Sequence, residues 1–497
     1  MHHSKPLVRP DYLFDREFEW AELERFVSYP GTGPALGVVS GRRRQGKTFL
    51  LDAVCQVTGG FYFAATEATP KESLRQLGSA LARHARQPAP YRFAQWEDAV
   101  EVLMTLPGID DAPLPVVLDE FPFLAKASPE LPSLLQRALG PAQRREGRRT
   151  RLLLCGSALS FMRDLLAGGA PLRGRASLEL VVPTLDYRLA AEFWGITDPR
   201  LAVLMNAVVG GTPAYAREFS LGDTPADAAD FGPWVLRNVF NPGRPLFREA
   251  RLLLAEEPAI HDTALYQGVL SAVATGNHTR GGIANYLGRK STDLGHPLTV
   301  LEDIGLLIRE PDAFHRKRSA YRIAEPILSF YHAVMRPEWS DLERPGRAAQ
   351  VWERVQPTFL SQVVGPHFER LCRYWTRWHA APESLGGTSA EIGTGTIADP
   401  AARVSVEIDV VVTGRRDDAH NVVLAIGEAK WSETVGLPHL ERLQRAAALV
   451  AAHHDVAPSG PRLLLFGGAG FSAELRRTAD LDQAIQLVDL DRLYHGS

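Results

Sequence analysis

The chain has 497 residues, of which 45% are hydrophobic and 23% charged, with a formal net charge of −3. This ordinary globular composition argues against extended disorder, and the balanced charge excludes a basic field over the whole protein, so any nucleic-acid contact must use local patches. At about 150 residues per domain, the length predicts about three domains.

The first block, residues 1–225, alternates apolar runs with segments of helical period. A helix is predicted at Thr48–Val57, and strands are predicted at Ala35–Ser40, Gly60–Ala65, Leu114–Leu118 and Arg151–Cys155. Continuous apolar runs separated by helices are typical of a parallel sheet covered on both faces. The first block is therefore expected to be a doubly wound α/β domain.

A phosphate-binding loop joins the first predicted strand to the predicted helix. It matches the pattern GxxxxGK[ST] in full and consists of Gly41, Arg42, Arg43, Arg44, Gln45, Gly46, Lys47 and Thr48. Gly41 and Gly46 let the backbone aim its N–H groups at phosphate oxygens. Lys47 adds charge near the β- and γ-phosphates, and the Thr48 hydroxyl is a ligand for Mg²⁺. A Gly-rich turn beside a basic patch is the alternative, but a strand before the motif and a helix after it favour the nucleotide site.

Two carboxylates end the third predicted strand. Asp119 would hold Mg²⁺ through water, and Glu120 would orient and deprotonate the attacking water. Ser157, at the end of the strand LLLCGS, could sense the γ-phosphate. Arg175 could supply charge to the transition state, in cis or from a neighbouring subunit, so a homo-oligomer is an open alternative; a solvated surface arginine is equally compatible with the sequence.

Five runs of the first block occur together in one order: SGRRRQGKT, VVLDEF, LLLCGS, PLRGRASLEL and VGGTPAY. In these runs the chain resembles the archaeal-type P-loop ATPases, which are placed near the AAA+ and STAND NTPases. The resemblance implies an ATP-dependent conformational switch rather than a metabolic kinase. It assigns ATP and Mg²⁺ binding to the loop and Asp119, hydrolysis to Glu120, and an arginine role to Arg175.

The middle block, residues 226–345, is mostly helical and is expected to contain a winged helix. Two helices are predicted within 282–304, followed by a strand, and Ala320–Ile323 would return as the partner strand. The segment between the strands carries Arg316, Lys317 and Arg318, which suit phosphate contact. DNA binding and a lid that moves with ATP are both open, because acidic residues on the would-be recognition helix would repel phosphates. Arg336–Arg347, with two prolines, is the expected linker.

The third block, residues 346–497, returns to strand patterning at Val404–Val412, Val422–Ala429 and Arg462–Phe466. Asp409 lies on the first of these strands, and Glu428 and Lys430 end the second on one face. Carboxylates from adjacent strands can hold Mg²⁺, and a lysine can activate water for attack on a phosphodiester. Glu369, on the amphipathic helix Gly365–Trp375, could be a further metal ligand.

This third block resembles a PD-(D/E)xK restriction-endonuclease-like α/β domain, with Ile408 in place of the usual proline. The resemblance implies that Asp409, Glu428 and Lys430 are catalytic. The alternative to a catalytic site is that these acidic and basic residues are simply solvated on the strand faces.

The predicted function is ATP binding and hydrolysis coupled to a metal-dependent DNA nuclease-like module, with ATP, Mg²⁺ and DNA as ligands. The alternative is a STAND-type regulatory switch whose later domains bind DNA or a protein without cleavage. Cys55, Cys155 and Cys372 form no CxxC pair, no run of about 20 apolar residues could cross a bilayer, and the N-terminus lacks the apolar core of a signal peptide. A cytoplasmic protein with no membrane partner is therefore expected.

Overall fold

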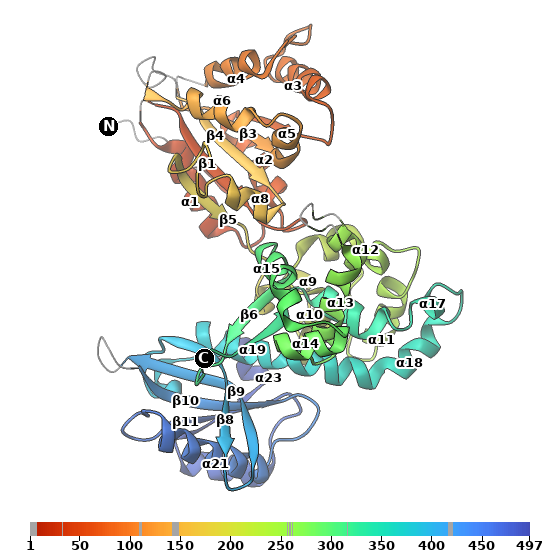
Figure 1. The fold of residues 1–497 in the computed structure, drawn as a ribbon, viewed down its shortest axis with the longest axis vertical. Coiled ribbons are helices and arrows are strands. Elements are labelled where there is room, and N and C mark those ends of the chain that lie inside the picture. Colours follow the sequence, from red (N-terminus) through yellow and green to blue (C-terminus); the bar gives the residue numbers. More distant parts are fainter. Residues whose placement is uncertain are drawn as a thin grey trace. The chain divides into compact units, whose positions relative to one another are not determined.

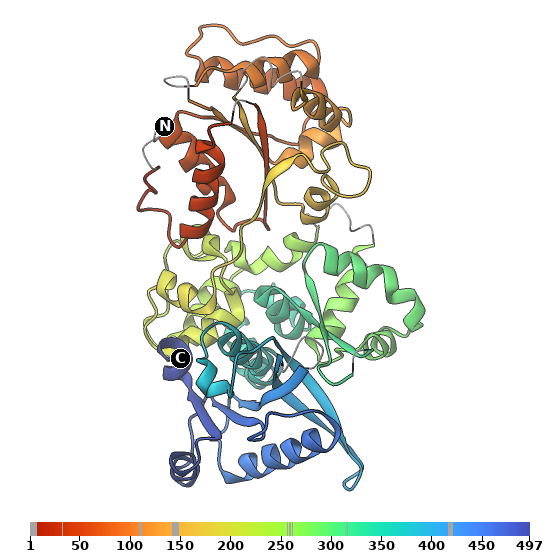
Figure 2. The same ribbon diagram turned by 90° about the vertical axis from the view of Figure 1, so that its left-hand side faces the viewer.

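The structure, a computed structural model, describes residues 7–31, 33–108, 112–141, 149–255, 257, 260, 262–315, 317–415 and 421–497. The chain forms two compact units, residues 1–185 with 212–214 and residues 186–211 with 215–497 (Figures 1 and 2). The division into three domains near residues 225 and 345 stays a prediction. No helix in the described ranges is long and apolar enough to cross a membrane.

The first unit is built on a parallel sheet of five strands in the order β2-β3-β4-β1-β5. The strands are β1 Ala35–Ser40, β2 Phe61–Ala64, β3 Pro115–Asp119, β4 Arg151–Gly156 and β5 Ala176–Val181. Every residue of β3 and β4 is buried, as expected for central strands of a parallel sheet. The edge strand β5 alternates buried and more exposed residues, so it lacks the continuous apolar run by which the other four strands were predicted.

Helices cover both faces of this sheet. They are α1 Glu17–Ser28, α2 Lys47–Thr58, α3 Pro70–His84, α4 Trp96–Thr105, α5 Phe121–Ala127, α6 Leu131–Ala138 and α8 Leu159–Asp164. Alternate strand residues face the two layers: Val116 and Leu152 pack in the core that contains α3 to α6, whereas Val117 and Leu153 pack with α1 and α2. The unit is therefore an α/β domain with a parallel five-stranded sheet covered by helices on both faces, as predicted.

The second unit is mainly helical before residue 390. Its helices up to that point are α9 Tyr187–Trp194, α10 Pro199–Val209, α11 Phe231–Trp234, α12 Pro245–Ala255, α13 Thr263–Ala274, α14 Arg280–Leu287, α15 Gly295–Asp303, α16 Pro326–Phe330, α17 Trp339–Leu342, α18 Ala348–Thr358, α19 Gly365–Trp378 and α20 Pro382–Leu385. Asp186, Asp198 and Thr279 cap three of these helices by accepting hydrogen bonds from backbone N–H groups of the first turn. The expected linker Arg336–Arg347 contains α17, whose Leu342 is buried, so this segment packs as part of the unit.

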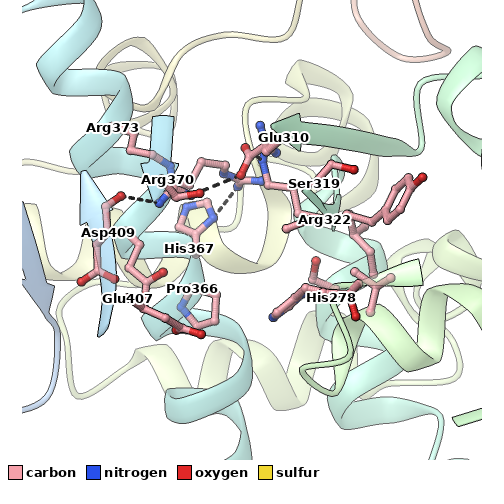
Figure 3. A pocket seen from close by; sticks show the side chains of 18 of the residues that line it. His278, Glu310, Ser319, Arg322, Pro366, His367, Arg370, Arg373, Glu407 and Asp409 are labelled. Atoms are coloured by element: carbon pink, nitrogen blue, oxygen red, sulfur yellow. Dashed lines mark hydrogen bonds and ion pairs between the residues drawn. The ribbon is translucent and has the colours of Figure 1, made fainter. Parts of the chain in front are cut away.

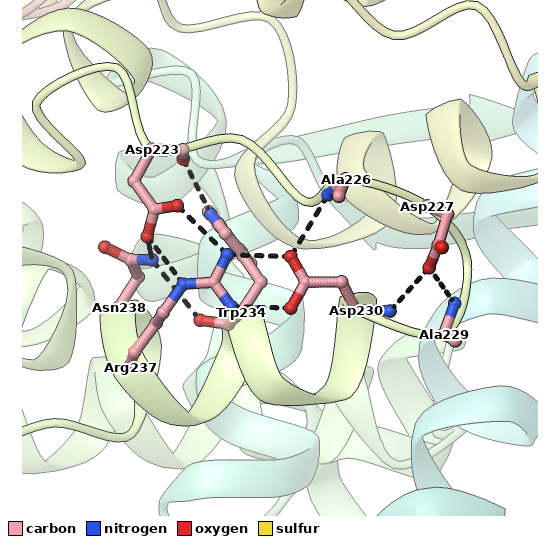
Figure 4. A network of polar contacts seen from close by, with 8 residues as sticks. All are labelled: Asp223, Ala226, Asp227, Ala229, Asp230, Trp234, Arg237 and Asn238. Atoms are coloured by element: carbon pink, nitrogen blue, oxygen red, sulfur yellow. Dashed lines mark hydrogen bonds and ion pairs between the residues drawn. The ribbon is translucent and has the colours of Figure 1, made fainter.

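A polar network fastens the segment that leads into α11. The guanidinium of Arg237 pairs with the carboxylates of Asp223 and Asp230, at 2.7 and 2.8 Å, and Asn238 donates to Asp223 at 2.6 Å (Figure 4). The hydrogen bonds from Arg237 lower the pKa of both carboxyl groups and raise that of the guanidinium. The network thus holds an irregular loop against the helix end.

A two-stranded antiparallel hairpin, β6 Leu307–Pro311 and β7 Ser319–Ile323, follows the helices α13 to α15. Helices α14 and α15 and the two strands lie where the helices and strands of a winged helix are predicted, and the winged-helix domain itself stays a prediction. The tip of the hairpin lies at residues 312–318, of which Arg316 is outside the described residues.

The second sheet contains β8 Glu391–Asp399, β9 Val404–Arg415, β10 Asn421–Lys430, β11 Arg462–Gly467 and β12 Ile485–Asp489, in the order β12-β11-β10-β9-β8. The pairs β8/β9 and β9/β10 are antiparallel, and the other two pairs are parallel. Helix α19 packs on one face, beside Val410 and Val412, and α21 Leu437–His453 packs on the other, beside Ile426 and Val411. The remaining helices are α22 Ala473–Leu481 and α23 Leu490–His495.

Candidate functional site

The phosphate-binding loop connects β1 to α2 in a backbone conformation that needs glycine. Gly41 has φ of 152° and Gly46 has φ of 89°, and Gly46 is the N-cap of α2. A Cβ at Gly41 would come within 2.6 Å of the carbonyl oxygen of Val182, whereas a Cβ at Gly46 would meet only open space. The start of α2 is therefore open beside Gly46, and the N–H groups at the start of a helix can bind phosphate.

Buried Arg16 anchors this loop from the N-terminal side. Its guanidinium donates to the carbonyl oxygens of Gln45 and Pro183 at 3.2 and 3.1 Å, and it pairs with the buried carboxylate of Glu19 at 3.5 Å. The loop is thus fixed to the chain that follows β5. Nothing in the sequence pattern singled out Arg16, because its partners lie 29 and 167 residues away.

Lys47 is buried and bends over the loop, where its Nζ donates to the carbonyl oxygen of Arg42 at 2.7 Å. Burial lowers the pKa of Lys47, and the nearby carboxylates of Asp119 and Glu120 oppose this shift. An anion bound at the loop would therefore receive a strong charge-assisted hydrogen bond from Lys47, since the amino group is already desolvated.

Asp119, the last residue of β3, accepts hydrogen bonds from two hydroxyl groups on one oxygen. Thr48 Oγ1 and Tyr62 Oη approach its Oδ2 at 2.8 and 2.5 Å. The two predicted Mg²⁺ ligands, Thr48 and Asp119, are thus in direct contact, and hard oxygen donors are what Mg²⁺ requires. The residues present fit this ion.

Tyr62 was missed in the sequence. It lies on β2, which pairs with β3 so that Tyr62 is aligned with Val117, two residues before Asp119 and therefore on the same face. Burial and the neighbouring Asp119 carboxylate raise the pKa of Tyr62, so its hydroxyl remains a donor. Strand alternation could have indicated this residue if the pairing of the two strands had been known.

Glu120 follows Asp119 in the left-handed region, with φ of 50°. A non-glycine residue is uncommon there, and such strain is often found at functional sites. Ser157 Oγ donates to the Glu120 carboxylate, with oxygen distances of 3.1 and 3.0 Å, and Arg43 Nε approaches Ser157 Oγ at 3.5 Å. The structure therefore brings Glu120 and Ser157 together beside the loop, while Arg175 is exposed immediately before β5.

In the second unit, Asp409 lies where β9 leaves its regular pairing with β8. Residues 409 and 410 together face Thr394, which is a β-bulge. Asp409 Oδ2 accepts a hydrogen bond from the backbone N–H of Ala429 at 2.9 Å, between Glu428 and Lys430. Burial, followed by repulsion from Asp409, raises the pKa of Glu369 to about 7, while Arg373 and Lys430 oppose the shift. Asp409, Glu369 and Lys430 therefore share one electrostatic environment.

Glu428 is buried and held by two cations. Lys430 Nζ lies 3.0 Å from its Oε1, and Arg442 Nε of α21 donates to its Oε2 at 3.0 Å. Within the described ranges, no three side chains among His, Cys, Asp and Glu are grouped so that they could hold a metal ion. As arranged here, the carboxylates do not fit a metal site, because Arg442 occupies the Glu428 carboxylate.

The hairpin tip packs on the second sheet. The backbone N–H of Ala313 donates to the Thr394 carbonyl of β8 at 2.8 Å, and Asp312 forms a bridge with Thr394. The ring of Phe314 covers Gly395 and lies 4.7 Å from the ring of His454. This part of the predicted wing thus contacts protein, whereas Lys317 and Arg318 are exposed.

No family model matches the chain. The chain is 26% identical over 310 residues to the uncharacterized protein MJECL04 of Methanocaldococcus jannaschii, a match that covers 62% of this chain and 65% of that protein. Among solved structures, a Walker-type ATPase of Pyrococcus abyssi is 19% identical, covering 66% of this chain and 98% of that chain with a TM-score of 0.48. The ORC2 protein of Aeropyrum pernix is 18% identical, covering 71% and 97% with a TM-score of 0.38. Residue roles therefore rest on the geometry of this chain alone.

Proposed function

We propose that the first unit binds and hydrolyses Mg-ATP. The observation that supports it best is the hydrogen bond from Thr48, which follows the glycine-containing loop, to Asp119 at the end of β3. The loop N–H groups and Lys47 would bind the phosphates, and Thr48 with Asp119 would hold Mg²⁺, which neutralises phosphate charge when bound. Tyr62 would keep the Asp119 carboxylate oriented.

Glu120 is the proposed base for the attacking water. Ser157 donates to both of its oxygens, so it orients the carboxylate and would exchange this contact for the γ-phosphate when nucleotide binds. Arg175 is exposed and would supply charge to the nucleotide in cis or, in a homo-oligomer, to the nucleotide of a neighbouring subunit.

The test is a pair of substitutions in the full chain. Lys47→Ala should abolish detectable ATP binding, because it removes the loop's buried ammonium. Glu120→Gln should bind ATP but turn it over about 10²–10⁴-fold more slowly. Glu130→Gln, on an exposed glutamate just before α6, is the matched control. Turnover like that of the unmodified protein in Glu120→Gln would show that another group is the base.

For the second unit we propose a nuclease-like module with Asp409, Glu428 and Lys430 as its centre and Glu369 beside it, which would act on DNA in a metal-dependent way only after Arg442 releases the Glu428 carboxylate. The hydrogen bond from Ala429 to Asp409 supports this proposal, because it fixes the two strand segments that carry these residues. The ion pair between Glu428 and Arg442 favours the rival function, a regulatory switch that binds DNA or a protein without cleavage.

A cleavage assay separates the two functions. If the module is a nuclease, protein with Mg²⁺ or Mn²⁺ cuts DNA, Asp409→Ala loses cleavage and keeps ATPase activity, and Arg442→Gln cuts at lower metal concentration because Glu428 is released. Lys430→Ala should retain metal binding and lose cleavage. Binding of DNA with no cleavage by either the unmodified protein or Arg442→Gln would favour the switch.

A further inference from the structure

A pocket of about 530 Å³ lies inside the second unit, between the hairpin β6–β7, helix α19 and the strands β8 and β9. Figure 3 shows its two sides: Glu407 and Asp409 lie on one side, and Arg322 and Glu310 lie on the other. The volume is in the range of pockets that hold small ligands. Neither the nucleotide loop nor the predicted wing requires a cavity here.

Three arginines line the pocket, and one of them, Arg373, donates to the backbone carbonyl oxygen of Asp409 at 3.0 Å. Arg322 comes from β7, and Arg370 and Arg373 come from α19 one turn apart. Arg322 and Arg373 share one carboxylate, Glu310, with Arg373 at 3.8 Å. The Glu310 carboxylate therefore forms ion pairs with two guanidinium groups.

Arg370 has no carboxylate among its hydrogen-bond partners in the described part of the chain. It donates to the carbonyl oxygen of Ala324 at 3.4 Å and to His367 Nδ1. His367 Nε2 lies 2.9 Å from Asn206 Oδ1, an acceptor, so Nε2 carries the proton and Nδ1 accepts from Arg370. Burial, and then the charge of Arg322, lowers the pKa of Arg370 to about 9.

Around Arg370, the three arginines face two carboxylates, Glu310 and Glu325, while Glu369, Glu407 and Asp409 line the rest of the pocket. A buried guanidinium is stable only if it is paired, and Glu325 is the one further acid among the groups that act on Arg370. The planar forks of three arginines match the three oxygens and the roughly −1.5 to −2 charge of a phosphate group.

We propose that this pocket binds a terminal phosphate group of a nucleotide, with Arg322, Arg370 and Arg373 as its ligands and the rest of the cavity holding the nucleoside. His278 and Tyr321 line the same cavity and offer aromatic surface to a base. The phosphate can come from a free nucleotide or from the end of a nucleic-acid strand. The proposal rests on the proposed nuclease-like module only in that Asp409 lines the same pocket, and binding requires neither metal nor cleavage.

The experiment measures binding by calorimetry in EDTA, with full-length protein carrying Lys47→Ala so that the phosphate loop does not contribute. The probes are AMP, a 5′-phosphorylated thymidine hexamer and the same hexamer without phosphate. The phosphorylated probes are expected to bind, and Arg373→Gln should weaken binding about ten- to hundredfold through loss of a charge-assisted contact. The hexamer without phosphate should bind at least tenfold more weakly than its phosphorylated form.

The matched control is Arg377→Gln. Arg377 lies one turn beyond Arg373 on α19 and donates to the Ile392 carbonyl, much as Arg373 donates to the Asp409 carbonyl, but it does not line the pocket. It should leave affinity unchanged. Arg318→Gln, on an exposed residue at the rim, provides a second variant in case Arg373→Gln does not fold, and it should weaken binding severalfold.

Binding of AMP and the phosphorylated hexamer identifies a free-nucleotide site that also accepts strand ends, and binding of the hexamer alone identifies a strand-end site. Three results would overturn the proposal: equal affinity for the hexamers with and without the phosphate, a loss of affinity in Arg377→Gln as large as that in Arg373→Gln, or no binding of any probe. Cleavage of DNA in Mg²⁺ with no phosphate-dependent binding in EDTA would overturn it while leaving the nuclease-like module intact. Phosphate-dependent binding with no cleavage would support the phosphate pocket and contradict the nuclease-like module.

Discussion

Acid should destabilise the second unit through His332. This side chain is buried, and its Nδ1 lies 2.9 Å from Ser271 Oγ, which itself accepts from Arg336. Accepting from Arg336 leaves the Ser271 hydroxyl proton available to Nδ1 of a neutral imidazole, and the Arg336 charge beside it disfavours a second proton on the ring. Burial, with a contribution from Arg336, lowers the pKa of His332 from 6.5 to about 3.

The direction of the change in folding stability with pH follows from the number of protons bound by the folded and unfolded chains. Between pH 6.5 and 3 the unfolded chain takes up a proton that the folded chain refuses, so stability is full above pH 6.5 and falls as the pH drops. At 1.36 kcal/mol per pH unit, the loss is about 2 kcal/mol at pH 5 and approaches about 5 kcal/mol near pH 3.

The assay is urea unfolding at pH 8 and pH 5, followed by tryptophan fluorescence. All tryptophans except Trp20 and Trp96 belong to the second unit, so the signal reports mainly that unit. His332→Asn cannot be charged, so it should lose about 2 kcal/mol less than the unmodified protein between the two pH values. Any loss of packing in His332→Asn is the same at both pH values, so it cancels in the difference between the two unfolding free energies. His296→Asn, on an exposed histidine, should follow the unmodified protein. Equal losses in His332→Asn and the unmodified protein would refute the reasoning.

Three other substitutions test separate features. Arg16→Met should destabilise the first unit by about 3 kcal/mol and weaken ATP binding, because it leaves buried carbonyl oxygens and a carboxylate without their donor. Thermal melting measures the loss of stability, and nucleotide titration measures the loss of affinity. Unchanged affinity would show that the loop does not need the contacts of Arg16. Arg237→Ala should cost about 1–2 kcal/mol in urea unfolding, with a smaller effect in high salt, since its ion pairs are partly exposed. If the wing binds DNA, neutralising Arg316, Lys317 and Arg318 together should reduce the log–log salt slope of DNA binding by up to about three units; an unchanged slope with DNA still bound would favour the lid.

The central strands β1, β3, β4, β10 and β11 could be predicted because they are mostly buried and therefore present long apolar runs, whereas β9 was predicted although polar residues interrupt its first half. The strands β5, β8 and β12 were not predicted. The β5 pattern alternates at the sheet edge, and β8 is rich in glycine and threonine, so neither presents a continuous apolar run. Burial, rather than strand propensity, carried the successful predictions.

More of the proposed nucleotide site than of the site in the second unit could be predicted from the sequence. Its loop is a contiguous pattern whose geometry is local, whereas the partners of Glu428 depend on strand pairing and on the rotation of α21. Arg442 lies 14 residues from Glu428 on a helix, and no spacing in the sequence indicates that its guanidinium reaches back to the strand. Tyr62 and Arg16 were missed for the same reason.

The contact between the hairpin tip and Thr394 has a consequence for solubility. β8 is one of the two edge strands of its sheet, and an open edge presents unpaired N–H and C=O groups that can template aggregation. The bridge from Asp312 and the ring of Phe314 blunt that edge. Deleting the tip would therefore produce a chain prone to edge-to-edge association, and a loss of DNA binding in such a deletion would report self-association rather than a missing DNA contact. Charge neutralisation at the exposed residues leaves the edge covered.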